Sequence, residues 1–138
     1  MSAYTEQYAP PGRPSSGQAR FPSRPEAPAA ACRFVRSLLD PVVPAERADD
    51  LELITSELVT NAYRYGTGPG DSVLVSVEAT AEPVRLEVHD PVRRHPHHKP
   101  ASDEHGRGRG LTIAKALATR WGVDNRPFGK AVWVEVEA

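Results

Sequence analysis

The sequence has one cysteine, no long apolar run and no excess of either charge, and each absence excludes a class of function. The single thiol, Cys32, excludes an intramolecular disulfide and a cysteine-based zinc cluster within one chain. No apolar run reaches the length of a membrane span, and the N-terminus lacks a hydrophobic signal core. Because 17 basic side chains nearly balance 18 acidic ones, no global field attracts nucleic acid or an anionic membrane. We therefore expect a cytoplasmic protein that contacts no membrane and no nucleic acid directly.

Large apolar side chains are also scarce near the N-terminus, where prolines stand among Ser, Gly, Gln and Arg. Such a segment cannot bury enough surface to offset the entropy lost on ordering. We expect residues 1–20 to form a disordered tail and residues 21–138 to form one domain, since 138 residues suffice for one core. Phe21 could begin a short edge strand of that domain.

The stretch from Leu51 to Gly66 carries the clearest pattern in the chain. Apolar residues recur there at helical spacing, at Leu51, Ile54, Leu58, Ala62 and Tyr65. The pattern predicts a helix over 45–65 that Gly66 ends. Glu57 and Asn61 lie four residues apart on the border of this stripe, where a carboxylate can act as a base and an amide oxygen can bind Mg²⁺. A solvated helix edge is the alternative interpretation of these two residues.

The remaining periodic segments predict an α+β domain. Further helices are expected over 26–39 and from residue 111, and strands over 73–78, 84–90, 121–126 and 131–137. Every short connection between strands resembles a hairpin, which favours an antiparallel or mixed sheet. We expect a two-layer α/β sandwich, with a mixed, mostly antiparallel sheet covered on one face by helices.

Asp90 breaks the apolar alternation of its strand. Val84, Leu86 and Val88 share one face, and Asp90 keeps their parity. A carboxylate directed at the buried side is costly unless it accepts a hydrogen bond. The donor could be the amino group of a ligand or a neighbouring backbone N–H.

Residues 91–110 show no apolar period and are rich in Arg and His, which is typical of a functional lid or a disordered segment. The segment ends in Gly106-Arg107-Gly108-Arg109-Gly110-Leu111 just before a predicted helix, so free backbone N–H groups, the helix dipole and two arginines favour an anion there. No Lys-Ser/Thr follows as in a Walker loop, and no strand precedes as in a dinucleotide fingerprint. A transition-metal site on the lid histidines (His95, His97, His98, His105) is the less favoured alternative to a solvated lid. Nucleic-acid binding by the lid is disfavoured because it lacks aromatic side chains for base stacking.

The order of these motifs resembles the Bergerat (GHKL) ATP-binding fold of histidine kinases, type II topoisomerases and a heat-shock chaperone. Within it, the chain most resembles the small anti-sigma-factor serine/threonine kinases and their actinobacterial relatives. The resemblance covers about residues 21–137, and its most specific parts are SELVTNA (56–62), GRGL (108–111), ALATRWGV (116–123) and the GKAVW of the last hairpin (129–133).

The resemblance implies a role for each motif. Glu57 would be the catalytic base, Asn61 would bind the Mg²⁺ that bridges the ATP phosphates, and Asp90 would accept a hydrogen bond from the adenine amino group. The glycine-rich box would close over the phosphates with Gly106, Arg107, Gly108, Arg109, Gly110 and Leu111.

Two positions depart from the family pattern. Val92 replaces a usual Gly or Ser two residues after Asp90, and Ala131 replaces a hydroxyl residue. A lost hydrogen bond weakens nucleotide binding by about 0.5–1.5 kcal/mol.

Two functions follow from the resemblance. The first is an ATP-dependent serine/threonine kinase that phosphorylates an anti-sigma-antagonist protein. The second is a non-catalytic regulator that sequesters a sigma factor or a related partner with weak or no use of ATP. A homodimer is possible in either case. A two-component histidine kinase is disfavoured because no dimerisation helix with a phosphoacceptor histidine precedes the domain.

Overall fold

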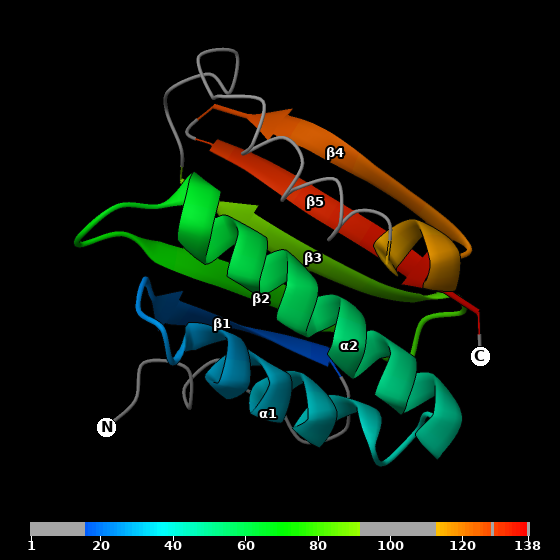
Figure 1. The fold of residues 1–138 in the computed structure, drawn as a ribbon. Coiled ribbons are helices and arrows are strands. Elements are labelled where there is room, and N and C mark those ends of the chain that lie inside the picture. The colour runs from blue at the N-terminus through cyan, green and yellow to red at the C-terminus, as the bar shows by residue number, and fades with distance from the viewer. Residues whose placement is uncertain (1–15, 92–112, 128, 138) are drawn as a thin grey trace.

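The protein is described by a computed structural model, which defines residues 16–91, 113–127 and 129–137. The elements follow the chain in the order drawn in Figure 1: β1 (Ser16–Pro22), α1 (Ala27–Leu39), α2 (Ala45–Asn61), the π-helical turn η2 (Ala62–Gly66), β2 (Ser72–Glu78), β3 (Val84–Asp90), β4 (Arg120–Arg126) and β5 (Gly129–Val136). Residues 113–117 form a further short helical segment.

The fold has two layers, and α1 and α2 cover one face of the sheet (Figure 1). Each helix buries the stripe that its apolar period predicts, and in α2 Leu51, Ile54 and Leu58 are at most 3% exposed. Valines at alternate positions of β2 and β3 meet these helices, because successive side chains of a strand point to opposite faces. The hydrophobic core therefore lies between the helices and the sheet.

The sheet has the strand order β1-β2-β3-β5-β4, and each of its neighbouring pairs is antiparallel. The predicted α+β sandwich with helices on one face is confirmed, although the sheet is antiparallel throughout and not mixed. β5 pairs with both β3 and β4, so the second strand of the final hairpin lies alongside the whole of β3, from Val84 to Asp90.

The first strand is longer than the sequence predicted. β1 begins at Ser16, inside the segment assigned to the tail, and pairs with β2 along seven residues. Ala19 and Phe21 are at most 1% exposed, and the Phe21 ring lies 5.9 Å from that of Phe34 in α1. Two alternating apolar residues, Ala19 and Phe21, were too weak a pattern to predict the whole strand. In the structure, pairing with β2 satisfies the backbone hydrogen bonds of the segment and makes it part of the sheet.

The end of α2 also differs from the prediction. The α-helix ends at Asn61 and continues as the π-helical turn η2, not as a regular helix to Tyr65. The helical segment ends at Gly66, as predicted, but Gly66 lacks the positive φ that a helix-terminating glycine usually has. Tyr65 is only half-buried. The wider turn changes the direction of the chain and carries Gly66 to the end of β3.

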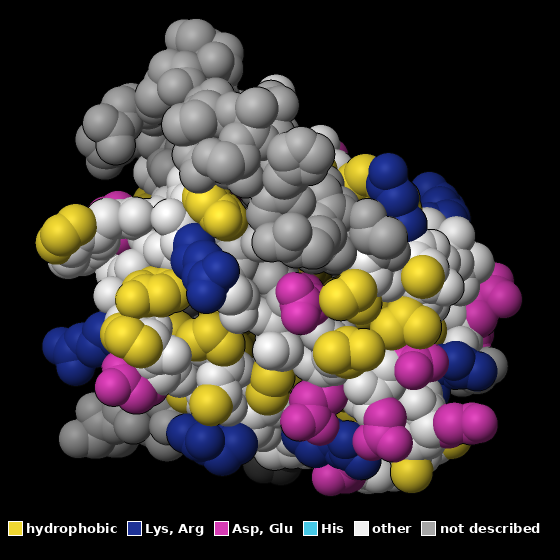
Figure 2. All heavy atoms as spheres, viewed as in Figure 1, with side chains coloured by type: hydrophobic (Ala, Val, Ile, Leu, Met, Phe, Trp, Pro, Cys, Tyr) yellow, Lys and Arg dark blue, Asp and Glu magenta, His cyan; other side chains and the backbone are white. Residues whose placement is uncertain are grey.

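One arginine connects the two helices at the end where α1 finishes and α2 begins. Arg36 donates to Asp40, Asp49 and Glu52 at 2.6 to 2.8 Å. Figure 2 shows acidic side chains gathered around basic ones on this part of the helix-bearing face. These contacts connect α1 to α2 on the surface, whereas the buried apolar residues pack both helices on the sheet.

The face of the sheet opposite the helices carries a charged network. Glu87 accepts hydrogen bonds from Arg85 (2.7 Å) and His89 (2.8 Å), and Arg85 also donates to Glu135. The Arg85 guanidinium lies 4.4 Å from the centre of the Trp133 ring, a cation–π distance. Burial favours a raised Glu87 pKa, but the hydrogen bonds and charges of Arg85 and His89 outweigh it and lower the pKa.

In the part of the chain that the structure describes, no helix is long and apolar enough to cross a membrane. Within the same residues, no group of three or more His, Cys, Asp or Glu side chains could hold a metal ion. The lid histidines lie outside the described residues.

Candidate functional site

Asp90 is the last residue of β3, and the structure buries it as its strand parity predicts. It is 7% exposed and, apart from Thr55, it is the one polar or charged residue among the buried residues of the described ranges. Its side chain points to the helix-bearing face together with Val88 and Leu86. A carboxylate at this depth requires donors around it.

Gly66, at the end of η2, packs directly against this carboxylate. A Cβ atom built on Gly66 would lie 2.6 Å from both Cγ and Oδ2 of Asp90. Only glycine leaves space for the carboxylate beneath the π-helical turn. The turn that follows the Glu57 and Asn61 helix is therefore in contact with the buried acid of β3.

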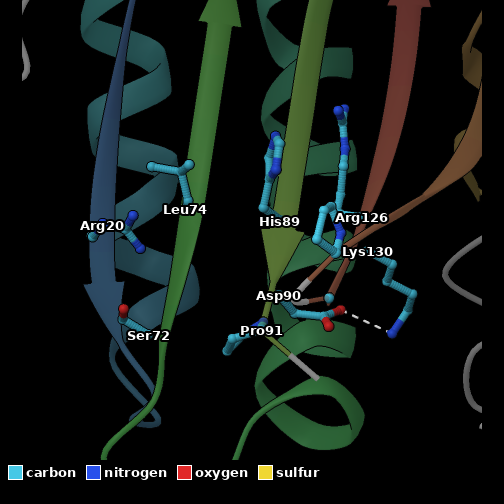
Figure 3. A pocket seen from close by; sticks show the side chains of 10 residues that line it. Arg20, Ser72, Leu74, His89, Asp90, Pro91, Arg126 and Lys130 are labelled. Carbon is cyan, nitrogen blue, oxygen red and sulfur yellow. Dashed lines mark ion pairs between the residues drawn. The ribbon is translucent and has the colours of Figure 1, made fainter. Parts of the chain in front are cut away.

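Lys130 provides the charge partner of Asp90. The two residues face each other in the β3–β5 register, so both side chains point to the helix-bearing face. Lys130 Nζ lies 3.0 Å from Asp90 Oδ2, and the side chains are only 14% and 5% exposed (Figure 3). Nevertheless the ammonium has no well-aligned hydrogen-bond acceptor among the described residues, so charge alone holds the pair.

Gly129, the first residue of β5, packs tightly against the backbone of Asp90. Gly129 has a φ of +156°, and a Cβ atom there would lie 2.0 Å from the carbonyl oxygen of Asp90. The conformation and the close contact both require glycine. As a result, the hairpin places Lys130 against the end of β3.

A hollow of about 320 Å³ lies at this end of the sheet. Figure 3 shows it from the face opposite the helices, with Arg20, Leu74, His89 and Arg126 in front of the strands and the Asp90–Lys130 pair at the strand ends. Arg126 lies 3.9 Å from Glu87 and 3.7 Å from Asp124, so its charge is only loosely paired. The charged side chains that line the hollow are therefore mainly positive, with Arg20, Arg126 and Lys130 against Asp90.

Glu57 and Asn61 lie one turn apart near the C-terminal end of α2, as predicted, and both are half-buried. Asn61 is the last α-helical residue, and η2 leads from it to Gly66 and hence to Asp90. Neither side chain lines the hollow of Figure 3. The structure therefore places both residues at the helix end that approaches Asp90, while the hollow belongs to the sheet side.

The phosphate-binding part of the predicted site lies outside the described residues. This applies to Val92 and to the whole glycine-rich box (Gly106, Arg107, Gly108, Arg109, Gly110, Leu111). Ala131 is described, and it is fully buried in β5 opposite His89 and Asp124. Its methyl group offers no hydrogen bond at a position where the resemblance implied one.

Sequence reasoning missed Gly66 and Lys130 as parts of this site. A signal for Lys130 was present, because it shares the parity of Val132, Val134 and Val136 and should therefore point to the buried face. No sequence signal indicated that Gly66 would contact Asp90, since the residues are 24 positions apart.

These features define a class of protein: a two-layer α/β domain with a buried carboxylate at a strand end, covered by the turn that leaves a polar helix. The sequence profile of the family described as "Histidine kinase-like ATPase domain" matches residues 21–136. The chain therefore belongs to the histidine kinase-like ATPase domain family.

A solved structure agrees on the fold. The chain is similar to the histidine kinase domain of the blue-light activated histidine kinase EL346 from Erythrobacter litoralis, with a TM-score of 0.51 and 20% sequence identity. The similarity covers 80% of this chain and 60% of that one, so the chain spans less than two thirds of that relative. No curated protein matches the sequence.

Proposed function

We propose that this protein binds Mg-ATP between the end of β3 and the end of α2 and acts as a serine/threonine kinase on an anti-sigma-antagonist-type protein. The observation that carries the proposal is the buried Asp90 carboxylate, which lies directly under Gly66 at the end of the Glu57–Asn61 helix. Membership of the histidine kinase-like ATPase family supports ATP as the ligand.

The described residues fit the adenine end of such a ligand. Asp90 is a buried acceptor that can bind the amino group of the base, and Gly66 adds no side chain that would block the approach. The Asn61 amide oxygen is a suitable ligand for Mg²⁺, which prefers oxygen. The backbone N–H groups of Gly106 to Leu111, with Arg107 and Arg109, complete the proposal on the phosphate side.

Glu57 has the role of general base in this mechanism. Its carboxylate would accept the proton of the partner's serine or threonine hydroxyl as that oxygen bonds to the γ-phosphorus, while the bond from this phosphorus to the bridging oxygen breaks and ADP leaves. Mg-ATP, when bound, would supply the γ-phosphoryl group and a cation that neutralises charge on the phosphates. Glu57 and Asn61 lie on one face of a rigid helix, so their spacing is fixed before any ligand binds.

A second function is favoured by a different observation. Asp90 already has an ion-pair partner in Lys130, and Ala131 provides no hydroxyl for the nucleotide. Both features support a non-catalytic regulator that captures a sigma factor or a related protein, as monomer or homodimer, with little use of ATP.

The first test is titration calorimetry of Mg-ATP with the wild type and Asp90→Asn. We expect the wild type to bind and the variant to lose at least about tenfold in affinity, because the amide offers the base an uncharged acceptor. Glu57→Ala is the matched control, since removing a base for proton transfer should leave nucleotide binding intact.

The results for the wild type and for Glu57→Ala distinguish the kinase from the non-catalytic regulator. If the wild type does not bind at millimolar Mg-ATP, the nucleotide site is refuted and the binding role is favoured. If it binds, phosphotransfer to candidate partners becomes the next assay, and Glu57→Ala must abolish it. Partner capture that survives Glu57→Ala without any phosphotransfer by the wild type would support the regulator.

A further inference from the structure

Lys130 has a buried ammonium whose hydrogen-bonding capacity the described residues leave unused. Its side chain is 14% exposed, and Nζ has a charge partner in Asp90 but no aligned acceptor within the described part of the chain. A lysine usually extends its ammonium into water, so burial without acceptors is costly. The cost is recovered if a ligand brings an acceptor to Nζ.

The pairing of β3 with β5 fixes the position of Nζ relative to Asp90, and hence the position that a ligand acceptor must take. Asp90 and Lys130 are directly paired residues on the same face, and 3.0 Å separates Oδ2 from Nζ. The protein therefore presents an acceptor and a donor side by side. A complementary ligand has a donor and an acceptor at neighbouring positions along one edge.

Adenine has this pattern on its Watson–Crick edge, where the N6 amino donor stands beside the N1 acceptor. We infer that Lys130 is a specificity-determining residue that donates a hydrogen bond to N1 of the base whose amino group Asp90 accepts. Guanine placed in the same orientation would direct its O6 acceptor at the Asp90 carboxylate, which is unfavourable. The inference rests on the proposed ATP site and adds the residue that selects the base.

The test is a double-mutant cycle that removes N1 from the nucleotide and the ammonium group from Lys130, singly and together. Mg-ATP and 1-deaza-ATP, in which N1 is replaced by C–H, are titrated into the wild type and into Lys130→Met. For the wild type we expect 1-deaza-ATP to bind at least about tenfold more weakly, because a charged donor loses its acceptor. Lys130→Met should bind the two nucleotides with affinities within about twofold of each other.

Lys115→Met is the matched control, because it removes the same charge from an exposed lysine. It should show the wild-type difference between the two nucleotides. An equal loss on N1 deletion in the wild type and Lys130→Met would overturn the inference. Tighter ATP binding by Lys130→Met would also overturn it, since Lys130 would then compete with the base for Asp90.

A measurement on the wild type avoids dependence on the folding of a variant. The chain has three lysines, Lys99, Lys115 and Lys130, so their ammonium signals can be resolved by NMR with labelled lysine. The Lys130 signal should shift with Mg-ATP and shift much less with 1-deaza-ATP at saturation. A wild type that binds no ATP refutes the proposed function, whereas ATP binding without a Lys130 response refutes only this inference.

Discussion

At the scale of single residues, three described residues make close contacts to Asp90 at the end of β3. Gly66 lies above the carboxylate, Lys130 pairs with it, and Gly129 packs on its backbone carbonyl. Two of the contacts require glycine, because a Cβ atom would collide, and the third requires a positively charged side chain. The position is therefore sensitive to changes as small as one methyl group.

Gly66→Ala tests this sensitivity. The new methyl group would lie 2.6 Å from Cγ and Oδ2 of Asp90, so the turn or the carboxylate must move. We expect a loss of about 1–3 kcal/mol in the free energy of unfolding, measured by urea denaturation. Gly68→Ala is the control, because its nearest neighbour, Asp71 Oδ2, is 3.9 Å away. Equal stabilities for the two variants would contradict the close contact.

At the scale of elements, the open face of the sheet is held by ion pairs across β3 and β5. Glu87 joins Arg85 and His89, and Arg85 continues to Glu135 on the neighbouring strand. The Trp133 ring lies beside Arg85 and over Gly122, where a Cβ atom would approach the ring to 2.7 Å. Among the described residues, this face therefore carries charged contacts and no layer of helices.

The lowered Glu87 pKa gives this network a predictable pH dependence. Because the folded-state pKa is below the unfolded-state value, the carboxylate stabilises the fold above the ordinary Glu range and loses that contribution as pH falls through the folded-state pKa. We expect Glu87→Gln to reduce the free energy of unfolding by about 1 kcal/mol at pH 7. The difference from the wild type should shrink in urea denaturations at successively lower pH below about 4.5.

Glu78→Gln provides the control on the same face, because this carboxylate is exposed. It should change stability by less than about 0.5 kcal/mol at pH 7. A Glu87→Gln difference that stays constant down to pH 3 would show that the carboxylate charge is not the source of the stabilisation.

At the scale of the whole molecule, the edge strand β1 completes the core. Ala19 and Phe21 are buried against the helices, and β1 covers the edge of β2 along its length. Within the described residues, the domain therefore includes the chain from Ser16 onwards, five residues before the start of the family-profile match.

Two truncations test this boundary. Deleting residues 1–22 removes β1 and Phe21, and we expect it to cost at least about 3–5 kcal/mol, the usual cost of removing one buried phenylalanine side chain. Deleting residues 1–15 removes none of the described core and should leave the unfolding midpoint unchanged. Identical midpoints for the two truncations would show that β1 does not contribute to stability.

Much of the fold could be predicted because it depends on local periodicity. The stripe of α2 and the alternation of β2, β3 and β5 are written in neighbouring residues, and burial follows them directly. For the same reason the burial of Asp90 was predictable from Val84, Leu86 and Val88. The sequence by itself therefore determined the helices, most strands and which face each one buries.

The tertiary structure decided what surrounds Asp90. Gly66 and Lys130 lie 24 residues before and 40 residues after it in the chain, so no local pattern joins them. The π-helical turn carries the first to Asp90, and the insertion of β5 beside β3 carries the second. The Lys130 contact arises only when β3 and β5 pair in this register, because the register fixes which side chains meet across a sheet.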